Sequence, residues 1–247
     1  MRTSHQIVSG CLLGAVLWAS RGYFHAEGPA RPGAFGEEGS VSAYEAASSR
    51  GIASSSGIVD VCTPPDSWLV ADTTLYFQRT TEWCWAASGQ MILHFFKKNV
   101  SQCTQANEQF GLHKCCKKKT PGDCISSGWP HFEIYGLKPA IKCNQALSWE
   151  EVKTQLYCRN QPFAFTWHHI GSAGGHMMVA VGYKTVEATQ FVCVNNPWPP
   201  MQGDFYCHTY EEYVSDPTHH THWNDYYAFT EEQPAAKMEK RGDPCAP

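Results

Sequence analysis

One cysteine of the chain stands in surroundings that suit a nucleophile. Cys84 lies between Trp83 and Trp85 in the segment QRTTEWCWAAS, and Gln78 precedes it by six residues. Residues 83–98 carry alanines, long side chains and apolar residues at helical spacing, which predicts a buried helix that begins at the cysteine. A helix N-terminus stabilises an anion, so it lowers the pKa of a thiol and favours the reactive thiolate. The alternative is that Cys84 is one more disulfide partner.

A thiolate nucleophile needs a general base and groups that stabilise an oxyanion. Of the twelve histidines, His176 has the most suitable position, because it follows the glycine-rich residues 171–175 and opens the apolar segment HMMVAVGY. A base at a strand start beside a glycine loop is held on one side and open to a cleft on the other. His168 and His169 are the nearest alternatives, and at the end of a predicted strand they are interpreted as ordinary polar residues.

An imidazole that shuttles protons needs a partner that orients it. The segment VNNPWPP offers Asn195 and Asn196 about twenty residues beyond His176, at the end of the next predicted strand. Trp198 could cover a hydrogen bond between this asparagine and the histidine and keep water away from it. Alone, NNPWPP is a turn signal, but with a glutamine, a cysteine and a histidine ahead of it the segment predicts a third catalytic group.

The chain order glutamine, Cys-Trp, histidine and Asn-x-Trp resembles the papain-like cysteine peptidases over about residues 62–230. Finer motifs are similar to the compact bacterial branch of secreted and effector peptidases, which includes staphopain-like and plant-pathogen effector proteases. These motifs are WCWAAS, VSQCTQAN, the CC pair and GGHMMVAVGY.

The resemblance implies a catalytic triad of Cys84, His176 and Asn196. It also implies that Gln78 donates its side-chain amide to the oxyanion hole, together with the backbone N–H of the nucleophile. The implied reaction is hydrolysis of a peptide bond through a thioester acyl-enzyme. Members of the compact branch often have aspartate where Asn196 stands, but an asparagine can orient a histidine without carrying charge.

The same resemblance implies a substrate cleft bordered by Trp85, Trp198 and Gly175. It implies a protein or peptide substrate and requires neither a metal nor an organic cofactor. Two alternatives remain open. A Cys-His-Asn triad also supports deamidation or another acyl transfer by a toxin or effector, and a disulfide-rich scaffold of this kind could serve as a non-catalytic binding protein.

The predicted fold class is α+β, with a helical N-terminal half and an antiparallel sheet in the C-terminal half. A second helix is expected between Ser101, which can cap it, and Gly111, which can end it. Ser148 and Glu151 form a capping-box pattern at the start of a third helix. Residues 112–147 are expected to be rich in loops. The predicted strands are FAFTWH, HMMVAVGYKT, QFVCVNN and NDYYAFT.

The N-terminal residues predict export. Residues 1–26 hold an arginine and then an apolar run too short to span a bilayer, as in a signal peptide. Residues 27–60 are rich in Gly, Ala, Ser and Glu and are expected to be a flexible linker or a short pro-segment, with autocleavage near residue 60. A peptidase domain at 61–232 and a tail at 233–247 complete the predicted organisation. We expect a secreted protein, extracellular or periplasmic, with no stable membrane association once the signal is removed.

The cysteine count agrees with export. With Cys11 in the signal and Cys84 set aside, an even number remains, which predicts up to five disulfides. The ten are Cys62, Cys103, Cys115, Cys116, Cys124, Cys143, Cys158, Cys193, Cys207 and Cys245. The adjacent Cys115 and Cys116 are expected to pair with different partners, because a bridge between neighbours is strained. A metal site of the four cysteines from 103 to 124 is the alternative, but no Cys-x-x-Cys spacing favours it.

Charge and the remaining histidines give little further function. The net charge is −4 and the one basic run, residues 117–119, lies in no basic stripe, so we expect no nucleic-acid binding. His219, His220 and His222 could hold a metal, but the segment DPTHHTHW is interpreted as a solvated loop. The protein is expected to be a monomer.

Overall fold

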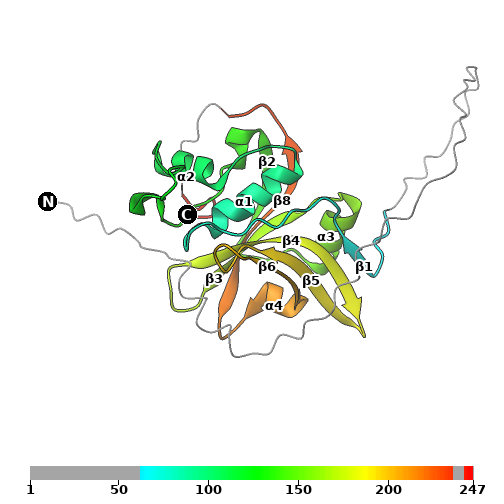
Figure 1. Cartoon of the computed structure of the whole chain (residues 1–247). Helices are drawn as coiled ribbons and strands as arrows, with labels where there is room; N and C mark the ends of the chain where they lie inside the picture. The colour runs from blue at the N-terminus through cyan, green and yellow to red at the C-terminus, as the bar shows by residue number, and fades with distance from the viewer. Residues whose placement is uncertain (1–61, 236–241, 247) are drawn as a thin grey trace, which may run out of the picture.

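The structure is a computed structural model, and it describes residues 62–235 and 242–246 (Figure 1). The predicted signal peptide at 1–26, the predicted linker at 27–60 and the expected cleavage near residue 60 lie outside the described residues. In the described ranges, no helix is long and apolar enough to span a bilayer.

One antiparallel sheet organises the described part of the chain. Its strands are β1 (Ser67–Leu69), β2 (Leu137–Cys143), β3 (Phe163–His169), β4 (Gly175–Val186), β5 (Thr189–Asn196), β6 (Asp204–Thr209), β7 (Ser215–Asp216) and β8 (His220–Glu231). The order is β2-β8-β3-β4-β5-β6, with β1 paired to β4 and β7 paired to β8. All the pairs are antiparallel. The four predicted strands are therefore confirmed.

Two of the longer strands were not predicted. β2 falls in the segment expected to be rich in loops, and β6 follows the Asn-Pro-Trp turn. The sequence of β2, LKPAIKC, contains Pro139, and the register of its pairing with β8 shifts between Lys138 and Ala140. Proline is tolerated only at an edge strand or a bulge, and β2 has both features.

The sequence predicted the first three of the four α-helices in the described residues and missed the fourth. They are α1 (Cys84–Phe95), α2 (Gln102–Phe110), α3 (Trp149–Lys153) and α4 (Tyr210–Val214), with shorter turns η3 (Gly122–Cys124), η4 (Phe132–Tyr135) and the π-helical η5 (Thr154–Cys158). The Ser101 side chain caps α2, and Gly111 ends it with a left-handed φ of 64°. Ser148 and Glu151 form both bonds of a capping box at α3. The expected α+β fold, with its helical half first, is confirmed.

Alternate residues of β4 face two buried apolar clusters. Met177, Val179 and Val181 pack in the cluster that contains the apolar face of α1. Met178 and Ala180 pack in the second cluster, with α3, η5 and α4 side chains. Because side chains alternate along a strand, β4 is the central strand that joins the two layers.

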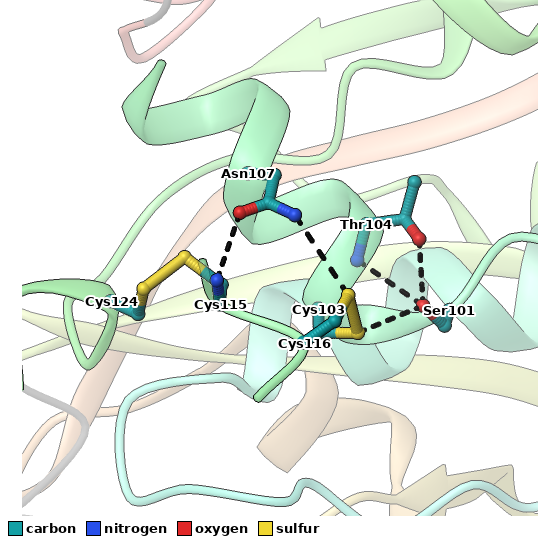
Figure 2. The surroundings of a disulfide bond; sticks show 7 residues. All are labelled: Ser101, Cys103, Thr104, Asn107, Cys115, Cys116 and Cys124. Carbon is teal, nitrogen blue, oxygen red and sulfur yellow. Dashed lines mark hydrogen bonds between the residues drawn. A yellow bond between two sulfur atoms is a disulfide. The ribbon is translucent and has the colours of Figure 1, made fainter. Parts of the chain in front are cut away.

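Five disulfides link the described residues, and they use the ten cysteines expected. The pairs are Cys62–Cys158, Cys103–Cys116, Cys115–Cys124, Cys143–Cys245 and Cys193–Cys207. The neighbours Cys115 and Cys116 have different partners, as predicted. Their two bridges contain all four cysteines of the alternative metal site, Cys103, Cys115, Cys116 and Cys124. Figure 2 shows Asn107 of α2 between these two bridges, where its Oδ1 accepts from the backbone N–H of Cys115 at 3.0 Å.

The interpretation of DPTHHTHW as a solvated loop is wrong for two of its histidines. β8 begins at His220, and His220 and His222 are buried. The ring of His220 stacks on Trp167, with centroids 3.7 Å apart, and His222 Nε2 lies 3.1 Å from a carboxylate oxygen of Asp225. A single residue, Thr221, separates these histidines, so both lie on one face of the strand, and their aromatic rings pack in the core.

Candidate active site

The proposed nucleophile lies where the sequence predicts it. Cys84 is the first residue of α1 and is 4% exposed. Among the cysteines of the described ranges, it is the one outside a disulfide. No side chain caps α1 at Trp83, and the first turn holds no acidic residue. The positive end of the helix dipole therefore falls on Cys84, where it can stabilise a thiolate.

The two indoles beside Cys84 tie the helix start to the disulfide-linked loops. Nε1 of Trp83 donates to the carbonyl of Cys124 at 2.8 Å, and Nε1 of Trp85 donates to the carbonyl of Ser126 at 3.3 Å. Both indoles are buried. A Cβ on Gly128 would lie 2.9 Å from the Trp85 ring, so the loop packs closely on it. The contacts of Trp85 here are structural, and its role in lining a substrate cleft stays a prediction.

The predicted base and its predicted partner are hydrogen-bonded. His176 is the second residue of β4, Asn196 is the last residue of β5, and His176 Nε2 lies 2.7 Å from Asn196 Oδ1. The backbone N–H of Trp198 donates to the same oxygen at 3.0 Å. Of the two asparagines in VNNPWPP, the structure therefore joins the second to the histidine.

A hydrogen bond connects the helix of the nucleophile to the strand of the base. One turn along α1 from Cys84, Ser88 Oγ donates to the carbonyl of Met177 at 3.1 Å, and Met177 follows His176. Both Ser88 and Met177 are buried. This contact ties α1 to β4 one turn beyond Cys84 and one residue beyond His176.

The rival histidines have other environments. The His168 ring packs edge-on against Trp223, with centroids 4.8 Å apart. Burial, helped by the nearby imidazoles of His176 and His220, lowers the pKa of His169 to about 4. His169 is thus neutral over the ordinary pH range, and His176 is the histidine that meets the asparagine.

Gln78 is buried beside the Asn-Pro-Trp turn. Its backbone N–H donates to the carbonyl of Pro197 at 3.0 Å, and its carbonyl accepts from the N–H of Met201 at 3.0 Å. Its side-chain Nε2 donates to the carbonyls of Thr80 at 2.7 Å and Thr81 at 3.0 Å. The glutamine therefore lies next to the segment that bears Asn196, but both of its amide hydrogens are engaged within its own loop.

Gly175 has a packing requirement of its own. A Cβ there would clash with the carbonyl of Trp167 and lie 3.0 Å from the Trp223 ring. The glycine lets β4 approach β3 immediately before His176. Its predicted contact with substrate stays a prediction.

One residue that touches this group was missed. Tyr206 of β6 accepts from Asn196 Nδ2 at 3.1 Å through its hydroxyl, which donates to Met178 Sδ at 3.7 Å. The local sequence, DFYCHT, carries no catalytic motif. Only the pairing of β5 with β6 brings Tyr206 to the asparagine, so no signal in the sequence marked it.

Residues 70–233 match the model of the Peptidase_C39 like family. The chain belongs to the Peptidase_C39-like family. No curated protein sequence matches this Peptidase_C39-like chain.

Solved structures with a similar arrangement include two proteases or their precursors. A proCathepsin B from Trypanosoma congolense has 14% identity, covers 70% of this chain and 79% of its own, and gives a TM-score of 0.42. Xylellain, a cysteine protease from Xylella fastidiosa, has 12% identity, covers 67% of this chain and 86% of its own, and gives a TM-score of 0.42.

Proposed function

We propose that this Peptidase_C39-like chain is an exported papain-like cysteine peptidase of the compact bacterial branch, acting on protein or peptide substrates. Membership of a peptidase family supports the reaction class. The observation that carries the proposal is the 2.7 Å contact between His176 and Asn196, on the strand that Ser88 ties to the helix of Cys84. A cysteine outside any disulfide at a helix start, a histidine and an orienting amide are the groups that thiol acyl transfer requires.

In the proposed mechanism, the Cys84 thiolate attacks the carbonyl carbon of the scissile peptide bond. Asn196 Oδ1 accepts from His176 Nε2–H, so the imidazole exchanges protons with the thiol and the leaving amine through Nδ1. The protonated imidazole gives its Nδ1 proton to the amine as the peptide bond breaks, which leaves a thioester on Cys84. Water then attacks the thioester, with His176 as the base, and releases the acid and the thiol.

The oxyanion would be held by the backbone N–H of Cys84 and the Gln78 amide. The first N–H groups of a helix have no acceptor within it, which suits the first of these donors. Because Gln78 Nε2 donates to Thr80 and Thr81, it must exchange one of these carbonyls for the oxyanion as the transition state forms. Such a donor strengthens its interaction only in the transition state, and this differential interaction is what raises kcat.

The proposed organisation keeps the predicted boundaries. Residues 1–26 are a signal, 27–60 a linker or pro-segment, 61–232 the peptidase domain and 233–247 a tail. The five disulfides of the described residues support an oxidising compartment. The tail is tied to the domain by the Cys143–Cys245 bridge and by Asp243, whose carboxylate accepts from Trp223 Nε1 at 2.8 Å. A monomer that binds its substrate from solution completes the proposal.

Two measurements on the exported protein test the function. The first is intact mass after brief, low-dose iodoacetamide near pH 6 without reductant, and the second is cleavage of fluorescent casein. The wild type is expected to gain one adduct and to cleave casein. Cys84→Ala should do neither, and His176→Ala should lose at least roughly 10³-fold in turnover. His168→Gln is the matched control and should keep activity, since its ring packs on Trp223 instead.

Each other outcome has a definite meaning. An adduct at Cys84 without cleavage of casein or a peptide library would replace the peptidase by a deamidase or another acyl transferase. No adduct on folded wild-type protein would contradict an activated thiolate and favour a binding scaffold. Identical N-termini in the wild type and in Cys84→Ala would contradict autocleavage near residue 60.

A further inference from the structure

The Asn196 side chain has two ends, and the structure gives each end a different partner. Its Oδ1 meets His176 Nε2 and the backbone N–H of Trp198, whereas its Nδ2 donates to the hydroxyl of Tyr206. An amide turned by 180° would present N–H groups to the histidine instead of an oxygen. The orientation of this amide therefore decides which tautomer His176 adopts.

We infer that Tyr206 is a positioning residue, which holds the Asn196 amide with its oxygen toward His176. This inference rests on the proposed function for its effect on catalysis. Tyr206 itself touches neither the substrate nor the reacting sulfur in the proposed mechanism, so it acts through the asparagine.

The direction of each hydrogen bond follows from groups that can act in only one way. The thioether of Met178 has no proton, so at 3.7 Å from the Tyr206 oxygen it can only accept the phenolic hydrogen. With its own hydrogen directed to sulfur, the Tyr206 oxygen offers a lone pair to Asn196, and Nδ2 is the end of the amide that can use it. At the other end, the backbone N–H of Trp198 can only donate, so the atom facing it must be Oδ1.

Three adjacent strands supply this arrangement. Met178 lies two residues beyond His176 on the same face of β4, Asn196 ends β5, and Tyr206 lies on β6. In the register of β5 and β6, Val194 pairs with Tyr206 and Asn196 pairs with Asp204, so Tyr206 is a diagonal same-face neighbour of the asparagine. Asn196 and Met178 are buried, so water competes little for these hydrogen bonds.

The arrangement also explains why an asparagine suits this position. A carboxylate at residue 196 could only accept, so it would draw the Tyr206 hydrogen away from Met178. The amide instead accepts at one end and donates at the other, and the hydroxyl that receives its donor is itself directed by the sulfur. The neutral asparagine thus fixes the histidine without placing a charge in a buried position.

The test compares Tyr206→Phe with Tyr210→Phe. Both changes remove one hydroxyl and keep the ring, but the Tyr210 hydroxyl donates to the carbonyl of Leu147 at 2.9 Å, away from Asn196. Histidine ¹⁵N–¹H correlation spectra distinguish the Nε2–H tautomer from the Nδ1–H tautomer. They would be recorded on Cys84→Ala protein, with the His176 signal assigned by its loss in His176→Gln.

We expect His176 as the Nε2–H tautomer with Tyr206 present, and as a mixture of both tautomers in Tyr206→Phe. Tyr210→Phe should keep the single tautomer. In active protein, Tyr206→Phe should lower kcat about tenfold with KM little changed, because the loss of one hydrogen bond changes a rate by about tenfold.

Met178→Leu is a second variant that keeps volume and removes the acceptor for the phenol. Its Tyr206 hydroxyl can then donate to the asparagine, so a partial tautomer mixture and a smaller fall in kcat are expected. A single Nε2–H tautomer in both Tyr206→Phe and Met178→Leu would overturn the inference and leave Tyr206 a packing residue. The tautomer is measured without turnover, so a protein that cleaves no peptide would refute the proposed function and still test this inference.

Discussion

Cys84 and His176, the proposed nucleophile and the proposed base, are held by different kinds of interaction. Around Cys84, covalent bridges dominate: Cys103–Cys116 and Cys115–Cys124 close short loops, and the flanking indoles donate to the carbonyls of Cys124 and of Ser126 just beyond it. Around His176, adjacent strands supply a hydrogen-bonded group of side chains. We call the first region the bridged side and the second the sheet side. We therefore expect reduction of the disulfides to change the reactivity of Cys84, and acid to change the stability of the residues around His176.

The largest expected effect lies on the sheet side, at Asp225. Its side chain is fully buried, accepts from the backbone N–H of Leu147 at 2.8 Å and from the Tyr213 hydroxyl at 2.9 Å, and lies 3.1 Å from His222 Nε2. Asp225→Asn places an N–H₂ group against one of these donors. We expect a loss of about 3–5 kcal/mol in the free energy of unfolding, measured by urea denaturation.

Asp216→Asn is the control for Asp225→Asn. Asp216 also accepts from side chains and backbone, at Thr218 and His219, but it ends the two-residue strand β7 and its side chain is 20% exposed, whereas Asp225 is fully buried. Water can replace these bonds, so the loss should be roughly 1 kcal/mol or less. Equal losses for the two aspartates would show that the buried network adds nothing to the stability of the sheet side.

The second prediction compares a bridge from each side. Removing Cys115–Cys124 or Cys193–Cys207 by paired serine substitutions opens loops with separations of 9 and 14 residues, so loop entropy gives about 3 kcal/mol in each case. The ladder of β5 and β6 still holds Cys193 beside Cys207, so the measured loss there should be the smaller. Only removal of Cys115–Cys124 should slow alkylation of Cys84, because Cys124 and Ser126, two residues beyond it, carry the carbonyls that bind the two indoles.

Iodoacetamide rates and urea denaturation of both double variants check this prediction. A rate at Cys84 that falls equally in the two variants would contradict a separate bridged side. So would a rate that changes in neither.

The sequence predicted more of the local structure on the bridged side than on the sheet side. The helix that begins at Cys84 and the cap of α2 at Ser101 depend on local patterns, and local patterns are visible in a sequence. The different partners of Cys115 and Cys116 followed from the geometry of a disulfide. The sequence did not predict that the Gln78 side-chain amide donates to carbonyls of its own loop, because these hydrogen bonds depend on the backbone conformation.

On the sheet side, the histidine and asparagine were visible but their supports were not. Tyr206 reaches Asn196 only because β6 pairs with β5, and a short strand that follows a proline-rich turn gave no clear alternation. The burial of His220 and His222 depends on the packing of β8 against β3, and a run of histidines alone suggests a loop. Long-range pairing therefore separates what could be predicted from what could not.

The third prediction concerns acid stability and also belongs to the sheet side. Burial, with His220 and His176 nearby, lowers the pKa of His208 to about 3 from its ordinary 6.5. The unfolded chain takes up a proton as the pH falls below about 6.5, but the folded protein does not until about pH 3. Stability is therefore full above pH 6.5 and declines as the pH falls from there towards 3. His208 alone should cost on the order of 2 kcal/mol between pH 7 and pH 5.

His208→Phe keeps a ring between Trp167 and Tyr206 and removes the titration. In this variant, the unfolding free energy should fall less between pH 7 and pH 5, by the amount that His208 contributes. His113→Gln, at an exposed position after α2, should leave the dependence on pH unchanged. If His208→Phe does not alter this dependence, the acid sensitivity arises elsewhere. His169 is one such group, because its pKa of about 4 also makes the folded protein less stable as the pH falls.

The smallest expected effect tests whether the indoles and the bridges act together. Trp85→Phe removes the hydrogen bond to the Ser126 carbonyl and should cost roughly 1–2 kcal/mol. If the Cys115–Cys124 bridge holds that carbonyl in place, Trp85→Phe should cost less in a protein that lacks the bridge. The difference between the two costs should be about 0.5 kcal/mol or more. Trp167→Phe is the matched control on the sheet side, since its Nε1 donates to the carbonyl of Tyr213 at 3.0 Å. Its cost should be the same with and without the bridge, whereas equal coupling for both tryptophans would mean that the two sides are one cooperative unit.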